Sequence, residues 1–216
     1  MNKKELSIFL SKRPSDSRST SRRKPKHGVG INDADYKISA VIDGVSVLCP
    51  AYTCWADMLK RCYSKKFISS RPTYAGSSVC REWLNFSSFR RWWMEHSIDG
   101  YQLDKDIVSL GNKVYSPDFC VFVPNKFNSL IVFSDAARGD CKLGVCFDKD
   151  YGKYRARCKS QISGRVEDLG CFDDEDEAHE AWKSKRLDIA KRLKGEMDAI
   201  DDRIYNGIVS HIINAK

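Results

Sequence analysis

The C-terminal part of the chain carries the pattern that most restricts what it can fold into. Three short stretches, "LGVCFDKD", "KYRARCKS" and "RVEDLGCF", are separated by the turn sequences "DYG" and "ISG", which is typical of short β-strands. The next stretch, "DDEDEAHEAWKSKRLDIAKRLKG", has acidic residues in its first turn and basic residues in its later turns. Because this order of charge matches the helix dipole, the stretch predicts a long helix. Residues 143–194 are therefore expected to form a three-stranded antiparallel sheet packed on one helix.

Basic side chains occupy every second position of the middle stretch. Since neighbouring residues of a strand point to opposite faces, one face is expected to carry all four of these cations: Lys153, Arg155, Arg157 and Lys159. The residues between them, at 154, 156 and 158, then face the helix. A basic ribbon of this width fits the major groove of DNA, and Arg165 on the next strand is a further candidate contact. The alternative is a solvent-exposed strand with ordinary surface charge.

The stretches "GVCFDKDYGKYRARC" and "LGCFDDEDEAHEAW", with the helix that continues from them, resemble a known DNA-binding domain. It is the domain of plant ethylene-response-factor (APETALA-type) transcription factors, which also occurs beside phage nucleases. The resemblance covers residues 143–193. In that family the sheet lies in the DNA major groove, where alternate strand residues reach bases and phosphates. The resemblance therefore implies that double-stranded DNA is a partner of this chain.

The preceding part of the chain predicts a mixture of strands and helices. Residue patterns predict a β-hairpin around "DG" over residues 36–49, and helices over 52–64 and 86–96. The second helix can be capped by Asn85 or Ser87. Arg90 and Arg91 lie on this second helix, where they are either DNA contacts or solvated charges.

Two short strands over 101–107 and 119–123, followed by a helix over 124–133, predict a compact ββα unit. They belong to a region, residues 28–133, that resembles a phage family described as HNH endonuclease-like. The matching stretches include "WADMLKRCYS", "LDKDI", "GNKVYSP" and "CVFVP". The two resemblances together imply an α+β chain with an N-terminal ββα-metal (HNH-like) domain before the sheet-and-helix domain. This arrangement is similar to that of homing-type nucleases of tailed bacteriophages, which implies a place in the cytoplasm of an infected bacterial host.

The HNH resemblance implies roles for residues of the ββα unit. Asp104 and Asn128 fall where the family has its two metal ligands, so the resemblance implies Mg²⁺ or another divalent cation. Lys105 stands in place of the general-base histidine, and Phe119 in place of the asparagine that orients it. A lysine acts as a base only when burial lowers its pKa by several units, and in its protonated form it would hold phosphate instead. Asp106 points the same way as Asp104, and it is a candidate for completing the cation site or for acting as the base.

The nine cysteines include no Cys-x-x-Cys pair, and we expect them to be reduced thiols in a cytosol, mostly small and buried. Cys62, Cys80 and Cys120 lie within the HNH-like region and are the candidate zinc ligands. Their spacing matches no standard zinc site, so the sequence does not predict zinc.

Charge and composition supply the remaining expectations. Residues 1–27 hold nine Lys and Arg against two acidic residues, a net +7 of the chain's total of +8. This segment has too little apolar content to fold alone, so it is expected to be a disordered basic arm held near polyanions. Residues 134–142 are expected to be a linker and residues 195–216 a C-terminal extension. Because no apolar run approaches the ~18 residues that cross a bilayer, no membrane is expected as a partner.

Three functions are compatible with these features. The chain is a metal-dependent DNA endonuclease with a diverged site, a DNA-binding or regulatory protein that has lost nuclease activity, or a phage accessory protein acting on a host or phage protein. Asp104, Asp106 and Asn128 favour the first function, whereas Lys105 and Phe119 favour the second. No sequence feature argues directly for the third.

Overall fold

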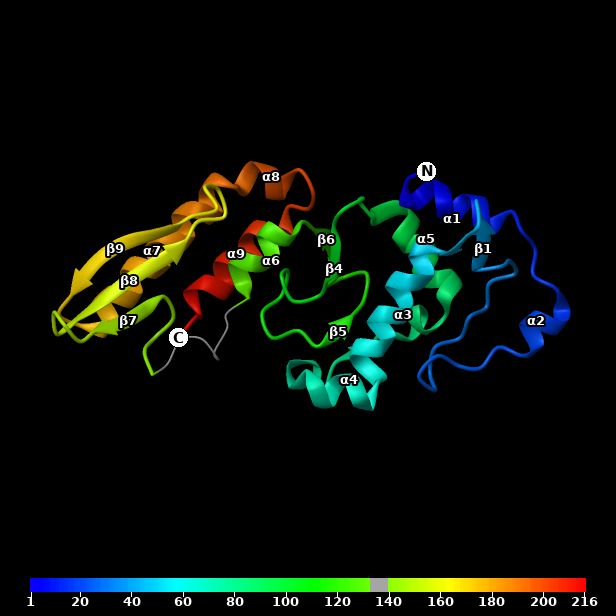
Figure 1. The fold of residues 1–216 in the computed structure, drawn as a ribbon, viewed down its shortest axis with the longest axis horizontal. Coiled ribbons are helices and arrows are strands. Elements are labelled where there is room, and N and C mark those ends of the chain that lie inside the picture. Colours follow the sequence, from blue (N-terminus) through cyan, green and yellow to red (C-terminus); the bar gives the residue numbers. More distant parts are fainter. Residues whose placement is uncertain (133–139) are drawn as a thin grey trace. The chain divides into compact units, whose positions relative to one another are not determined.

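The computed structural model describes residues 1–132 and 140–216, and its chain divides into two compact units (Figure 1). The first unit comprises Met1–Asp106 with Gly111–Phe122, and the second comprises Ile107–Leu110 with Val123–Lys216. Most of the linker predicted over 134–142 lies outside the described residues. The division after residue 122 comes earlier than that linker, so helix α6 (Asn125–Ile131) belongs to the second unit.

Aromatic side chains form the core of the first unit. Trp55 of α3 (Pro50–Tyr63) is fully buried, and its Nε1 donates a hydrogen bond to the carbonyl oxygen of Trp83 at 2.7 Å. Its ring lies 5.5 Å from that of Phe86, which begins α5 (Phe86–His96). Both predicted helices are therefore confirmed, because the apolar residues that recur at helical spacing are the ones that pack against each other.

The predicted hairpin is confirmed as β1 (Ser39–Ile42) paired antiparallel with β2 (Val45–Leu48). Asp43 and Gly44 at its turn have φ angles of 50° and 77°. Positive φ at both central residues is the mark of a type I′ turn, whose twist matches that of the strands it joins. The "DG" pair therefore determines the turn locally.

The other elements of the first unit are short. They are α4 (Lys65–Ser70), β3 (Ser78–Val79), β4 (Gln102–Asp104), β5 (Val114–Tyr115), β6 (Val121–Val123) and the 3-10 helices η1 (Pro72–Tyr74) and η2 (Arg81–Leu84). β3 pairs with β5 in parallel, and β4 pairs with β6. The two strands and the helix predicted for the ββα unit are thus present as β4, β6 and α6. The strands lie in the first unit up to residue 122, while α6 lies in the second, so an HNH-like domain does not follow from these elements alone.

The N-terminal segment is folded, although the sequence predicted a disordered arm over residues 1–27. Helix α1 (Lys3–Ser11) begins with a capping box between Asn2 and Glu5, and α2 (Ser17–Ser21) follows. Leu10 is fully buried in the core of the first unit. The prediction was wrong because it weighed the charge of the segment and overlooked the apolar face that "LSIFL" presents to the rest of the unit.

The cap of α5 comes from a distant loop. Neither Asn85 nor Ser87 caps the helix with its own side chain. Instead, the Asp33 carboxylate accepts hydrogen bonds from the Ser87 N–H, at 2.8 Å, and from the Ser87 hydroxyl. A carboxylate at a helix N-terminus satisfies a free N–H and also interacts favourably with the helix dipole. The local sequence identified the start of the helix correctly and its capping residue wrongly.

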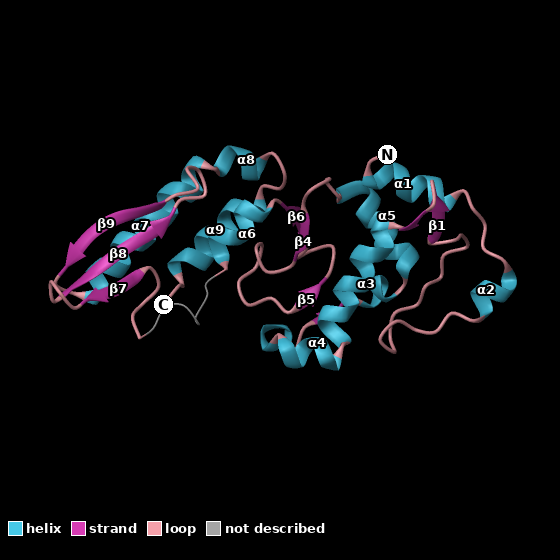
Figure 2. Cartoon of the chain, in the orientation of Figure 1, coloured by secondary structure: helices cyan, strands magenta, loops and turns pink. Residues whose placement is uncertain are grey.

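The second unit contains the predicted sheet and helix. β7 (Val145–Asp148), β8 (Lys153–Lys159) and β9 (Val166–Phe172) form an antiparallel sheet in the order β7-β8-β9. Figure 2 shows α7 (Glu175–Arg192) lying along one face of these strands. The predicted extension over 195–216 is mostly helical, because it contains most of α8 (Lys194–Asp198) and the whole of α9 (Arg203–Ile213). α9 packs against both α7 and α6.

Gly207 of α9 allows the segment at Ile107 and Val108 to pass close to this helix. A Cβ atom at this position would lie 1.9 Å from the carbonyl oxygen of Ile107 and 3.0 Å from the Cα of Val108. We expect Gly207→Ala to lower the free energy of unfolding of the second unit by about 2–4 kcal/mol, although alanine normally stabilises a helix by up to ~1 kcal/mol over glycine. Urea unfolding would measure this change. Gly195→Ala is the matched control, because nothing lies within 4 Å of a Cβ there; an equal response of the two variants would contradict the prediction.

Candidate functional site

Strand β8 carries the basic residues that the sequence singled out. Arg157 and Lys159 are exposed, whereas Ala156 and Cys158 are fully buried on the other face. Ala156 packs with Val145 and with Ala178 of α7, and a small residue there allows the helix to approach the sheet. The alternation predicted for this strand is therefore present, and the side chains of Arg157 and Lys159 project away from α7.

Two of the four strand cations are paired with carboxylates of the same unit. The Arg155 guanidinium donates to one Asp168 carboxylate oxygen from Nε at 2.7 Å and from Nη2 at 2.6 Å. The Lys153 ammonium lies 3.0 Å from an Asp173 oxygen. The Gly170 N–H and the Arg155 guanidinium lower the pKa of Asp168, which therefore stays ionised. Arg155 and Lys153 thus carry less uncompensated charge than the sequence pattern implied.

The remaining cations lie toward the turn between β8 and β9. Arg157, Lys159 and Arg165 are all exposed, and none of them forms an ion pair within residues 1–132 and 140–216. Lys159 pairs in register with Val166, and the Ser160 N–H donates to the Arg165 carbonyl oxygen at 2.9 Å. We call these three residues the turn-end cations. Arg157 and Lys159 lie on the outer face of β8, whereas Arg165 lies in the turn before β9.

Two cysteines on the sheet were not foreseen as surface residues. Cys146 and Cys171 flank Arg155 in register on the neighbouring strands, and both are exposed. The expectation of buried thiols is wrong for this pair. Side chains of a strand alternate between the two faces, and this alternation puts both cysteines on the outer face beside Arg155. The same alternation that located the cations could have found them.

In the ββα segment, Lys105 is buried and its polar atoms bond to neighbouring residues of the same loop. Its side chain is only 4% exposed, its ammonium forms an ion pair with Asp106, and it donates a hydrogen bond to the Asn112 carbonyl oxygen at 3.1 Å. The Asn112 side-chain amide donates in return to the Lys105 carbonyl oxygen at 2.7 Å. Asp104 accepts the Asp106 N–H at 2.8 Å. These bonds close the loop between β4 and β5, so the Lys105 side chain is used in holding this loop together.

Asn128 is the other proposed metal ligand, and it lies on α6 of the second unit. Its Oδ1 is buried and has no hydrogen-bond partner. A buried oxygen without a donor is compatible with a cation ligand, and Mg²⁺ prefers oxygen ligands such as those of Asp104 and Asn128. Within the described part of the chain, no cluster of three or more His, Cys, Asp or Glu side chains that could hold a metal ion is found.

Other residues predicted from the sequence lie in varied surroundings. Phe119 is 37% exposed in the loop before β6. Arg90 points inward, where its Nε and Nη2 donate to the hydroxyl and the carbonyl of Ser7 at 3.3 Å each. Arg90 thus holds α1 on α5, while Arg91 is exposed. Of these two arginines, Arg91 is exposed and Arg90 is partly buried.

The three candidate zinc-binding cysteines carry protons. Burial raises the pKa of Cys62 to about 12 and also raises that of Cys80 and Cys120. Because zinc binds the thiolate, protonated thiols are weak ligands until a metal displaces the proton.

Comparisons with protein-family models, with curated proteins and with solved structures find no match to this chain. A search of the helices in the described ranges finds none with the length and apolar character that crossing a membrane requires.

Proposed function

We propose that the chain binds double-stranded DNA through the exposed face of the β7-β8-β9 sheet. The observation that carries this proposal is the group of turn-end cations: Arg157 and Lys159 project from the sheet face that α7 does not cover, and Arg165 is exposed in the adjoining turn. A two- or three-stranded ribbon is narrow enough for the major groove, and uncompensated cations on it replace the counterions of the phosphate backbone. The resemblance of residues 143–193 to the APETALA-type domain supports the same partner.

Arg155 and Lys153 are paired with carboxylates, so they have a different role in this proposal. An arginine held by Asp168 is oriented before DNA arrives, so it loses less conformational freedom on binding. Asp168 and Asp148, which lies 3.8 Å from the Arg155 Nη1, also repel phosphates that approach wrongly. The turn-end cations are therefore proposed to supply most of the affinity, and Arg155 to supply orientation.

The double variant Arg157→Ala/Lys159→Ala tests this proposal. We expect its affinity for a duplex oligonucleotide to fall about 10- to 100-fold at physiological salt, and its log–log salt slope to flatten by about 2, because ~0.9 counterion is released per phosphate contact. Fluorescence anisotropy over a series of salt concentrations would measure both quantities.

The matched control for this experiment is Lys191→Ala/Arg192→Ala on α7. It removes the same charge from exposed positions that lie on the helix and not on the sheet. This control is expected to keep the wild-type slope. If the salt slope flattens equally in both double variants, binding depends on total charge alone. The sheet face is then not the DNA-binding surface.

A metal-dependent nuclease is the second candidate function, and the buried, unpartnered Oδ1 of Asn128 favours it. In this candidate a divalent cation would stabilise charge on the scissile phosphate, and the HNH resemblance implies Asp104 and Asn128 as cation ligands. The environment of Lys105 supports a role for this residue in holding the loop together, so water would have to be activated by another group. No second base is proposed.

A plasmid-nicking assay with Mg²⁺ or Mn²⁺ tests this candidate. Asp104→Asn is the informative variant, because the amide Oδ1 can still accept the Asp106 N–H while the charge that binds the cation is lost. If the chain is a nuclease, the wild-type protein nicks the plasmid. The Asp104→Asn and Asn128→Leu variants are then expected to nick at least ~100-fold more slowly. Intact plasmid with the wild-type protein would remove this candidate and leave DNA binding unaffected.

A further inference from the structure

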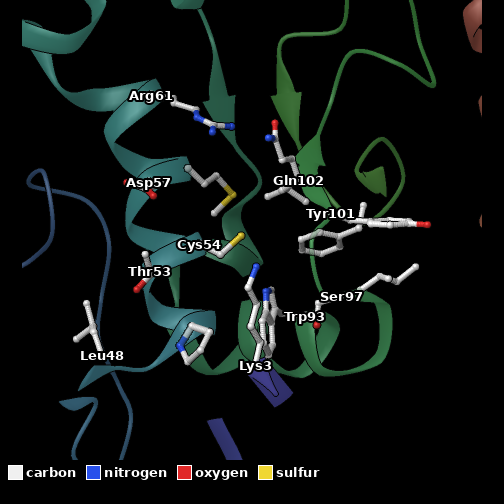
Figure 3. A pocket seen from close by; sticks show the side chains of 15 residues that line it. Lys3, Leu48, Thr53, Cys54, Asp57, Arg61, Trp93, Ser97, Tyr101 and Gln102 are labelled. Carbon is white, nitrogen blue, oxygen red and sulfur yellow. The ribbon is translucent and has the colours of Figure 1, made fainter. Parts of the chain in front are cut away.

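The first unit contains a pocket that neither proposed function uses. It has a volume of about 380 Å³ and lies between α3 and the segment that leads from the end of α5 into β4. Leu48, Met58, Ile98 and Phe122 are among the apolar residues that line it. Figure 3 shows Cys54, Asp57 and Arg61 along α3 on one side and Tyr101 and Gln102 on the facing side. This volume lies in the range of small-molecule sites.

The charged residues of the pocket leave one positive charge in excess. Lys3 and Arg61 are the cations that line it, and Asp57 is the acidic residue. Asp57 precedes Arg61 by one turn of α3, so these two charges are neighbours on the helix surface. Arg61 also lies over the Tyr74 ring at 6.0 Å. The ammonium of Lys3 forms no ion pair with any residue that the structure describes, and Figure 3 shows it reaching into the pocket.

The wall beside Lys3 is uncharged. Burial raises the pKa of Cys54 to about 12, so its thiol is protonated and behaves as a small apolar group. Met58 and Phe122 also line the pocket but are only 1% and 5% exposed, whereas Leu48 and Ile98, which line it too, are 43% and 40% exposed. An apolar group in this part of the pocket would therefore meet an uncharged lining, and the Lys3 ammonium lines the same pocket.

We propose that this pocket binds a small amphipathic monoanion. The apolar body of the ligand lies against the apolar lining, of which Leu48 and Ile98 are the exposed part, and its carboxylate or sulfonate pairs with the Lys3 ammonium. The excess of one positive charge favours a monoanion, and the apolar lining favours a ligand with an apolar body over a hydrated ion such as free phosphate. The pocket lies wholly in the first unit, so this proposal does not depend on DNA binding by the sheet.

The test uses two dyes that differ in charge. 8-Anilinonaphthalene-1-sulfonate is a flat aromatic monoanion, and N-phenyl-1-naphthylamine has the same ring system without the sulfonate. We expect the full chain to bind the anionic dye saturably at one site. Lys3→Gln is expected to weaken that binding about tenfold, because a charge-assisted hydrogen bond is lost, and to leave binding of the neutral dye unchanged. Fluorescence titration and calorimetry would measure both affinities.

Two further variants keep this test decisive. Lys12→Gln removes a lysine just after the end of α1 that does not line the pocket, and it is expected to bind both dyes as wild type does. Thr53→Trp adds a large side chain at an exposed position on the pocket rim, and it is expected to abolish binding of both dyes while the circular dichroism spectrum is kept. Equal effects of Lys3→Gln and Lys12→Gln would overturn the proposal. Displacement of the anionic dye by a duplex oligonucleotide would also overturn it, because the pocket would then belong to the DNA interface.

Discussion

Gly144→Ala is expected to lower the free energy of unfolding of the second unit by about 3–5 kcal/mol, the sum of a strained backbone and an overpacked core. Gly144 has a φ of +78°, which costs any residue with a Cβ roughly 1–3 kcal/mol. That Cβ would also lie 2.0 Å from Cδ1 and 2.2 Å from Cγ of Trp182. Trp182 is 5% exposed at the junction of α7 and the sheet, so its ring has little room to move. Urea unfolding followed by circular dichroism would measure the loss.

Gly164→Ala is the matched control for this prediction. Gly164 has a similar φ of +72°, but nothing lies within 4 Å of a Cβ there. It should therefore lose only the backbone part, about 1–2 kcal/mol. The difference between the two variants isolates the contact with Trp182. If the two glycines respond equally, the ring of Trp182 moves aside, and the close packing of Gly144 contributes nothing to stability.

Arg186→Met is expected to destabilise the second unit by about 2–4 kcal/mol. Arg186 is 5% exposed, and its Nη2 donates hydrogen bonds to the carbonyl oxygens of Ser129 at 3.1 Å and Leu130 at 3.0 Å. These carbonyls belong to the last turn of α6, which has no intrahelical donors for them. Burial lowers the pKa of the Arg186 guanidinium, which lies 5.3 Å from the centre of the Trp182 ring. Methionine preserves most of the volume, so the loss measures the hydrogen bonds.

The control is Arg192→Met, because Arg192 is on the same helix and is exposed. Hydrogen exchange of the α6 amides adds a local readout, and we expect α6 to exchange much faster in Arg186→Met and at the wild-type rate in Arg192→Met. Since Asn128 lies on α6, this variant also tests whether the cap positions that residue. Unchanged exchange in α6 would show that Arg186 contributes to stability without holding the helix.

The C-terminal sheet and helix were predictable because their signals are local. Alternation with period two placed Ala156 and Cys158 inside and Arg157 and Lys159 outside, and the burial of these residues agrees. The hairpin turn at Asp43 and Gly44 was equally local, since two residues with positive φ define it. In both cases the information lies within a few residues of the chain, and packing reinforces the local preference.

The candidate site was less predictable, because charge at a position does not reveal its partners. Arg155 and Lys153 look like free cations in the sequence, yet Asp168 and Asp173 pair with them across the sheet or from its end. Lys105 looks like a substituted catalytic base, yet it closes a loop with Asn112 seven residues away. Each partner was visible in the sequence, but only the register of strands and the path of a loop brought it within reach.

The sequence by itself determined the β1-β2 hairpin, the helices α3, α5 and α7, the three C-terminal strands and the outer face of β8, because side-chain period and turn chemistry act over short distances. Only the tertiary structure decided that the N-terminal segment folds onto the core through Leu10 and that Asp33 caps a helix over fifty residues away. It also decided that α6 joins the C-terminal unit, where Arg186 of α7 holds its end. These outcomes depend on which surfaces pack together. A contact between residues far apart in the sequence produces no periodic pattern in the sequence from which it could be predicted.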